Sequence, residues 1–190
     1  MTLSFSDRIR TCLFSFDQGF GEYRDESFKD AFVLYLTLLF AFSLLITIVI
    51  AAGLVVFGPA LEIPAAALLF IVPAVFLSSL VGGIISLFIG AAITHLFVLL
   101  FKGTGGYPET VRAACYSMVP TLLIGWTIIG AFITPPYWGM AIQVFALHEF
   151  HGISKLHAVL ATFIPVAVFV ALYYLFIIAM VFGTIMVNAM

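Results

Sequence analysis

A short segment near residue 150 contains residue types that bind transition metals. His148 and His151 lie three positions apart, so one face of a helix could present both, and Glu149 lies between them. The zinc-protease motif differs, because it places its two histidines four positions apart. The alternative is a polar helix end that caps backbone groups and meets lipid headgroups. We expect no metal or other cofactor, and a metal that did bind would use His148, Glu149 and His151.

Four other polar residues are candidates for function. His95 lies inside an apolar run, about 9 Å from its end at ~1.5 Å per residue. Ionisable residues inside a membrane are functional candidates by default, although a neutral histidine can simply hydrogen-bond a neighbour. Lys102, Lys155 and His157 flank apolar runs, where cations meet lipid phosphates. The glycine-rich loop at 102–106 is no P-loop, and no nucleophile has a base near it. We therefore expect no catalytic residues.

The composition explains why so few residues are candidates. Of 190 residues, 64% are hydrophobic and 8% are charged, with a net charge of -2. Mean hydropathy is +1.27. Soluble domains are roughly 45–50% apolar, and a nucleic-acid-binding protein would need a basic face. These figures exclude a soluble globular domain, a disordered chain and a nucleic-acid partner. They predict an all-α integral membrane protein.

The apolar runs predict the membrane crossings. Residues 31–57 form one uncharged run, but residues 64–101 would reach roughly 57 Å as one helix, against a hydrocarbon core of about 30 Å. Pro73 and the pair Gly82-Gly83 could break this second run. Either a short helix over 64–78 lies in the outer leaflet before one crossing over 79–101, or the run crosses twice.

The basic residues favour a single crossing by the second run. All seven then share one face, whereas two crossings divide them between the faces, and Lys and Arg concentrate on the cytoplasmic side. We therefore predict a five-helix transmembrane bundle with its N-terminus cytoplasmic and its C-terminus external; six crossings are the alternative. The crossings are about 31–57, 79–101, 112–134, 136–152 and 158–185, and the basic residues are Arg8, Arg10, Arg24, Lys29, Lys102, Arg112 and Lys155.

Residues 1–30 form a charged cytoplasmic segment before the transmembrane domain at 31–190. Within it, residues 4–20 predict an amphipathic helix that lies on the inner surface or packs against the bundle. Both cysteines fall on the cytoplasmic side, so we expect no disulfide. In the second crossing, small residues at every fourth position predict close helix packing, with a partner in the same chain or in a second copy; they are Gly82, Ser86, Gly90 and Thr94.

Two stretches carry a resemblance to a known family. FKGTGGYPETVRAACYSMVP at 101–120 combines a glycine turn with a helix that has an aromatic-Ser step and a proline, and GISKLHA at 152–158 precedes the last helix. Both resemble the Yip domain family of Ypt/Rab-interacting membrane proteins, over roughly residues 5–185. The resemblance implies five crossings, a cytoplasmic N-terminus, and binding to small GTPases and to other members. The chain lacks the acidic-Leu-Tyr-Gly-Pro stretch of eukaryotic relatives, which argues against a GTPase partner. It looks more like a prokaryotic member in the cell membrane.

Three functions follow from these observations. The leading hypothesis is a non-enzymatic scaffold or adaptor that binds membrane lipids, other membrane proteins or further copies of itself. The second is a transporter of small solutes or lipids, suggested by His95 and by prolines within the third and fifth crossings. The third is a metal-dependent membrane enzyme that uses His148, Glu149 and His151.

Overall fold

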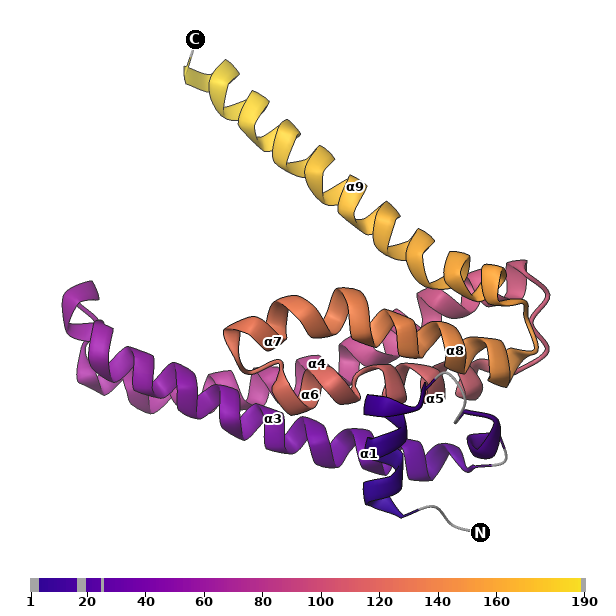
Figure 1. Cartoon of the computed structure of the whole chain (residues 1–190). Coiled ribbons are helices and arrows are strands. Elements are labelled where there is room, and N and C mark those ends of the chain that lie inside the picture. Colours follow the sequence, from indigo (N-terminus) through magenta and orange to yellow (C-terminus); the bar gives the residue numbers. More distant parts are fainter. Residues whose placement is uncertain (1–3, 17–19, 25, 189–190) are drawn as a thin grey trace.

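The computed structural model describes residues 4–16, 20–24 and 26–188, and within them every regular element is a helix (Figure 1). Long helices alternate with short ones that turn the chain. The elements are α1 (Phe5–Phe14), η1 (Phe20–Tyr23), α3 (Phe28–Phe57), η2 (Gly58–Leu61), η3 (Ala65–Ala67), α4 (Leu68–Leu100), α5 (Tyr107–Ser117), α6 (Val119–Ile124), α7 (Ile128–Ile133), η4 (Thr134–Gly139), α8 (Met140–His151) and α9 (Lys155–Asn188).

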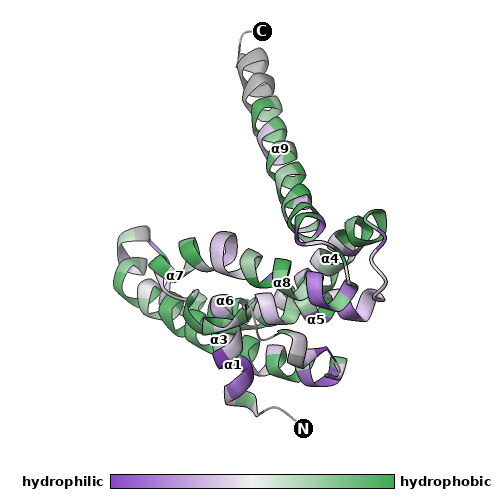
Figure 2. Ribbon diagram, turned by 45° about the vertical axis from the view of Figure 1, so that its right-hand side comes forward, coloured by the Kyte–Doolittle hydropathy of each residue, from purple (hydrophilic) through white to green (hydrophobic). Residues whose placement is uncertain are grey.

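Three helices are long and apolar enough to cross a membrane, within the part of the chain that the structure describes. They cover Phe28–Ala60, Leu68–Leu100 and Lys155–Met180. Figure 2 shows α9 as an almost uniformly hydrophobic helix, whereas hydrophilic residues gather around α1 and the start of α5. The chain is therefore an all-helical integral membrane protein.

The second apolar run forms one helix, so the prediction of a separate short helix over residues 64–78 is wrong. α4 continues for 33 residues from Leu68 to Leu100, with Pro73 inside it. Pro73 is in the second turn, where its missing N–H removes only one hydrogen bond near the helix end. The expected break at Gly82-Gly83 is absent for a different reason.

Gly83 allows α3 and α4 to approach each other closely. A Cβ at this position would lie 2.6 Å from Leu39 Cδ1, so a larger residue would force that buried leucine side chain to shift. The Tyr35 hydroxyl also donates a hydrogen bond to the Gly83 carbonyl oxygen at 2.8 Å. The glycine therefore joins two helices and does not interrupt either of them.

Residues 107–151 form a hairpin that differs from two plain crossings. The predicted third crossing, at about 112–134, is divided into α5, α6 and α7, with Pro120 in the first turn of α6. The chain reverses at residues 125–127, not at Pro135-Pro136 as expected. There the Thr127 hydroxyl caps α7 by accepting from the Gly130 amide at 3.0 Å.

The two prolines lie within a π-helical segment, and α7, η4 and α8 follow one another without an intervening loop. A π turn is wider than an α turn and uses a different hydrogen-bond spacing, so it accommodates the missing proline donors. The Thr134 hydroxyl donates to the Gly130 carbonyl at 2.7 Å. The predicted boundary at 136 is therefore wrong, since the second arm of the hairpin begins at Thr127.

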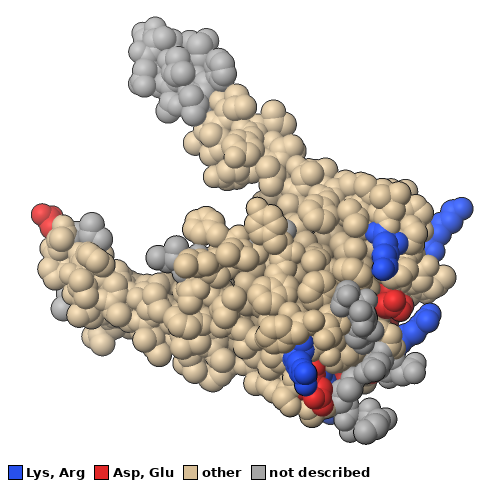
Figure 3. Space-filling model, in the orientation of Figure 1, with Lys and Arg blue, Asp and Glu red and all other residues tan. Residues whose placement is uncertain are grey.

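The basic side chains visible in Figure 3 gather at one end of the molecule. This end contains the starts of α3, α5 and α9 and the ends of α4 and α8. Ser27 caps α3, and the Ser154 hydroxyl accepts from the His157 amide at the start of α9. Glu62 follows η2 at the opposite end of α3. We call the end that carries the basic residues the basic end.

Candidate functional site

Three helices and one loop meet around a chain of hydrogen bonds near the basic end. His95 Nδ1 of α4 lies 2.7 Å from the Thr110 hydroxyl of α5, and His151 Nε2 of α8 lies 3.0 Å from the same oxygen. His151 Nδ1 lies 3.1 Å from the Gly105 carbonyl oxygen. Thr110 and His151 are fully buried, and His95 is half-buried. We call His95, Thr110 and His151 the histidine chain.

The partners of the histidine chain determine where its hydrogens lie. A carbonyl oxygen only accepts, so His151 Nδ1 carries a hydrogen and donates it to Gly105. In the neutral ring, Nε2 then accepts from the Thr110 hydroxyl, whose oxygen accepts from His95 Nδ1–H. If His95 carries a proton on both ring nitrogens, its Nδ1 proton can move to the Thr110 oxygen while the Thr110 proton moves to His151 Nε2, which reverses both bonds and keeps them formed. The arrangement can therefore pass a proton between two rings without opening the bundle.

The loop after α4 brings the histidine chain together. The residue with a positive φ in this loop is Lys102, at 59°, and not one of the glycines. Gly103 and Gly105 instead provide space: a Cβ would lie 2.5 Å from Val98 Cγ1 at the first and 2.6 Å from His151 Nδ1 at the second. Lys102 itself is exposed to solvent.

His148 and His151 do not face a common point. His148 Nδ1 lies 2.5 Å from the Ile153 carbonyl oxygen, and its Nε2 lies 3.9 Å from Glu149 Oε1. His151 is directed toward Thr110 and Gly105. Within the described residues, no three His, Cys, Asp or Glu side chains are grouped as a metal site requires. His151 therefore does not share a site with the other two metal candidates, His148 and Glu149.

Lys155 and His157 lie at the first turn of α9 and contact aromatic rings. The Lys155 ammonium is 5.1 Å from the centre of the Phe145 ring, within the range of a cation–π interaction. The His157 ring stacks on Phe101 with 4.8 Å between ring centres and 6° between planes. These contacts attach the start of α9 to the middle of α8 and to the end of α4.

Arg112 is buried at the basic end, although nothing in the sequence apart from its charge singles it out. It is 2% exposed and its Nη1 pairs with Glu109 Oε2 at 2.5 Å. Its Nη2 donates to the Tyr23 carbonyl oxygen, and its guanidinium carbon lies 4.5 Å from the centre of the Phe150 ring. Arg112 therefore connects the N-terminal segment to α5 and α8.

A second buried pair binds the same segment. Arg8 Nη2 of α1 lies 2.5 Å from Glu26 Oε1, with the two side chains 11% and 8% exposed. The Tyr116 hydroxyl of α5 donates to Glu26 Oε2. We call Arg8, Glu26, Glu109, Arg112 and Tyr116 the charge cluster. The sequence does not predict this cluster, because Arg8 and Glu26 are far along the chain from residues 109–116. The one available signal is a charged residue, Arg112, at the start of an otherwise apolar predicted crossing.

α1 packs on the bundle by way of this cluster. Its buried residues are Arg8 and Cys12, while Phe5 and Phe14 are exposed. The face that we expected to be apolar therefore points partly outward. Burial raises the pKa of the Cys12 thiol above its usual range, with a smaller contribution from the nearby Glu26 carboxylate. Cys12 and Cys115 are both free and buried.

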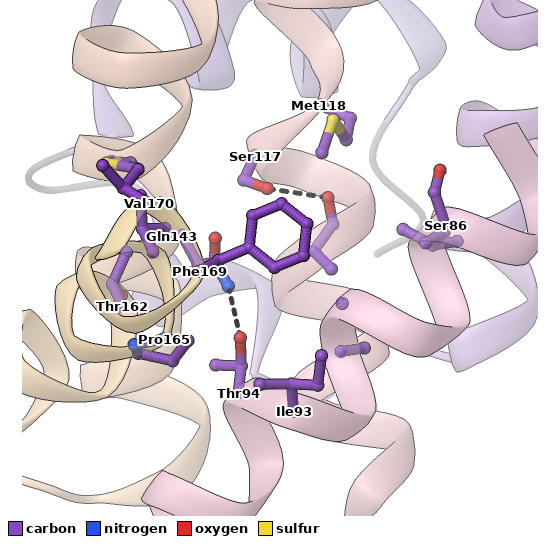
Figure 4. A pocket seen from close by; sticks show the side chains of 16 residues that line it. Ser86, Ile93, Thr94, Ser117, Met118, Gln143, Thr162, Pro165, Phe169 and Val170 are labelled. Atoms are coloured by element: carbon purple, nitrogen blue, oxygen red, sulfur yellow. Dashed lines mark hydrogen bonds between the residues drawn. The ribbon is translucent and has the colours of Figure 1, made fainter. Parts of the chain in front are cut away.

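A cavity of about 290 Å³ lies between α4, α5, α8 and α9 (Figure 4). Gln143 Nε2 donates to Thr94 Oγ1 at 3.4 Å beside it. His95 does not line the cavity. The small-residue stripe of α4 contributes three residues to the lining, which are Ser86, Gly90 and Thr94. A Cβ added at Gly82 or at Gly90 would meet nothing within 4 Å. The glycines of this stripe therefore make no close helix contact within the chain.

The fold and these sites define an all-helical integral membrane protein whose N-terminal segment is bound to its helices by buried charges. The model of the Yip1 domain matches residues 11–186, which is most of the chain. The chain therefore belongs to the Yip1 domain family. No curated protein and no solved structure matched in the comparisons.

Proposed function

We propose that this protein is a non-enzymatic membrane scaffold, which binds protein partners or lipids through its cytoplasmic face and its helices. The observation that supports the proposal is the charge cluster. It fixes residues of the N-terminal segment against α5 and α8 through contacts such as Arg112 with the Tyr23 carbonyl. A segment held in this way forms one continuous, preformed surface with the helix ends, and preformed surfaces bind with less loss of entropy.

The proposal includes five crossings with the N-terminus inside and the C-terminus outside. Its support is the distribution of charge, since α4 is one continuous helix and the basic side chains visible in Figure 3 gather at one end. Cations near helix ends favour the cytoplasm. In this layout the hairpin 107–151 supplies two of the crossings, although its helices are shorter than α3, α4 and α9.

Cross-linking in intact membranes tests the scaffold role. The wild-type chain should capture a reproducible set of protein partners before detergent is added. Glu26→Gln should reduce that set, because it removes the negative charge that pairs with Arg8 and so loosens the surface. Glu62→Gln is the matched control, since Glu62 is exposed at the opposite end. Failure of the wild type to capture any partner, or equal capture by all three chains, would contradict the proposal.

Transport of a small solute or a lipid is the second candidate function, and the cavity is the observation that favours it. Its lining is mainly apolar and does not include His95, so a lipid suits it better than a polar solute. Flux of a fluorescent phospholipid between the leaflets of protein-containing liposomes would support transport. A rate equal to that of protein-free liposomes would exclude it for that lipid.

A further inference from the structure

We infer that the cavity between α4, α5, α8 and α9 is a binding site for one acyl chain of a bilayer lipid. This inference does not depend on the scaffold role. Its first support is the position of the cavity, because α4 and α9 are both long and apolar enough to span a membrane. An opening between such helices faces hydrocarbon, which is the medium that can fill it.

The second support is that the cavity requires no polar group from its occupant. Five polar side chains line it, and each already has a hydrogen bond within the protein. Gln143 and Thr94 pair with each other, and the other three hydroxyls donate to backbone carbonyls of their own helices; these are Ser86 to Gly83, Ser117 to Ala114 and Thr162 to Ala158. Apolar cavities stay dry, so water is a poor occupant and hydrocarbon a good one.

The third support is the shape of the site. Its floor is buried, with Leu87, Ala91 and Ser117 each at most 3% exposed, whereas Phe169 and Ile93 at its edge are 73% and 42% exposed. Figure 4 shows the Phe169 ring projecting across the cavity between α9 and α4. A volume of about 290 Å³ is at the lower limit of small-molecule pockets, which suits a single chain better than a whole lipid.

Gly90 keeps the site open. A Cβ there would meet nothing within 4 Å, so a larger side chain has room at its base and would extend into the cavity that Gly90 lines. Gly82 lies on the same helix and also has nothing within 4 Å, but it does not line the cavity. Gly90→Leu and Gly82→Leu therefore make a matched pair, of which only the first should fill the site.

Photolabelling tests the inference. The full chain is placed in phosphatidylcholine vesicles that contain some phosphatidylcholine with a diazirine at the middle of one acyl chain, and the labelled residues are mapped by mass spectrometry. We expect label on Ala114 and Ser117, which are buried at the cavity floor, in the wild type and in Gly82→Leu. Gly90→Leu should lose this label. Label on exposed Phe70 should be equal in all three, which shows that the three chains are incorporated into the vesicles to the same extent.

A second variant covers the case in which Gly90→Leu does not fold. Gly90→Cys is purified folded and then modified with an apolar thiol reagent, which should abolish the floor label that is present before modification. Absence of floor label in the wild type, or its persistence after Gly90 is enlarged, would overturn the inference. A third outcome would also overturn it: Gly90→Cys forms a disulfide between two copies, and the floor residues carry no lipid label. A second copy of the chain would then occupy the site.

Discussion

Thr110 is the residue on which the histidine chain depends, because its one hydroxyl oxygen lies within hydrogen-bond distance of both His95 and His151. A threonine can fill this role because a hydroxyl both donates and accepts. The hydrogen bonds that connect the two histidine rings both run through this hydroxyl, and the ring centres are 5.9 Å apart. The polar groups of a buried chain such as this are costly to leave unpaired.

Thr110→Val should therefore destabilise the protein by about 1–3 kcal/mol, since it leaves buried ring nitrogens without a partner. Unfolding of the purified protein in mixed detergent micelles measures the change. Thr110→Ser keeps the hydroxyl and should retain most of the stability. Equal stability of the valine and serine variants would show that the hydroxyl contributes little.

His95 is a candidate from sequence alone, since an ionisable residue in an apolar run attracts attention. Its partners are not predictable in the same way. Thr110 is ordinary in composition, and His151 is more readily grouped with His148, which lies one helical turn away. The turn at Lys102 and the close packing at Gly103 and Gly105 help to bring α4, α5 and α8 to one point. Hydrogen-bond partners that depend on loop geometry are thus beyond sequence reasoning.

At the scale of elements, the main lesson is that glycine and proline have more than one structural meaning. The Gly82-Gly83 pair and Pro135-Pro136 both resemble breaks in the sequence, yet α4 is continuous and the two prolines lie in a π segment. The long apolar helices follow from composition and length. The roles of individual glycines depend on what packs against them, which a single sequence does not contain.

The two adjacent glycines of α4 should respond differently to the same substitution. Gly83→Ala places a Cβ 2.6 Å from Leu39 Cδ1 and should separate α3 from α4, with a loss of about 1–3 kcal/mol. Gly82→Ala meets nothing and should be neutral or stabilising by up to about 1 kcal/mol, since alanine is the better helix former. Unfolding in mixed micelles compares them.

Leu39→Ala provides the control for this comparison. It should relieve the clash in Gly83→Ala, so the double variant should be more stable than the sum of the two single changes predicts. Additive losses would mean that Leu39 is not what limits the space at Gly83.

At the scale of the whole molecule, the charge cluster joins an N-terminal segment to membrane helices, and Cys12 reports on that contact. Its thiol is 0% exposed, and burial keeps its pKa above the usual range, so the reactive thiolate is scarce at neutral pH. Wild-type protein should therefore react slowly with a maleimide reagent.

Glu26→Gln should accelerate the labelling of Cys12 for two reasons. Arg8 loses its ionised partner, so α1 leaves the bundle more often, and the carboxylate that helps to raise the pKa of the Cys12 thiol is gone. Cys115 is also buried, and its labelling should stay slow in both chains. Mass spectrometry of time points separates the two thiols. Equal rates at Cys12 with and without the substitution would show that other contacts hold α1.

The orientation of the chain can be tested with introduced cysteines in a variant without Cys12 and Cys115. Lys102→Cys should be labelled only from the cytoplasmic side, and Glu62→Cys only from the external side, since both positions are exposed and lie at opposite ends. Labelling of both positions from one side would contradict the five-crossing layout.

α9 touches the rest of the chain mainly through its beginning. Ala158, Ala161 and Thr162 are buried, whereas the side chains from Val166 to Met180 are exposed, and Figure 1 shows the helix leaving the other helices at a wide angle. Mechanical load applied at the C-terminus therefore reaches the remaining helices through one short region. In a single-molecule pulling experiment, α9 should be extracted as a separate first event, before the hairpin and the α3–α4 pair yield.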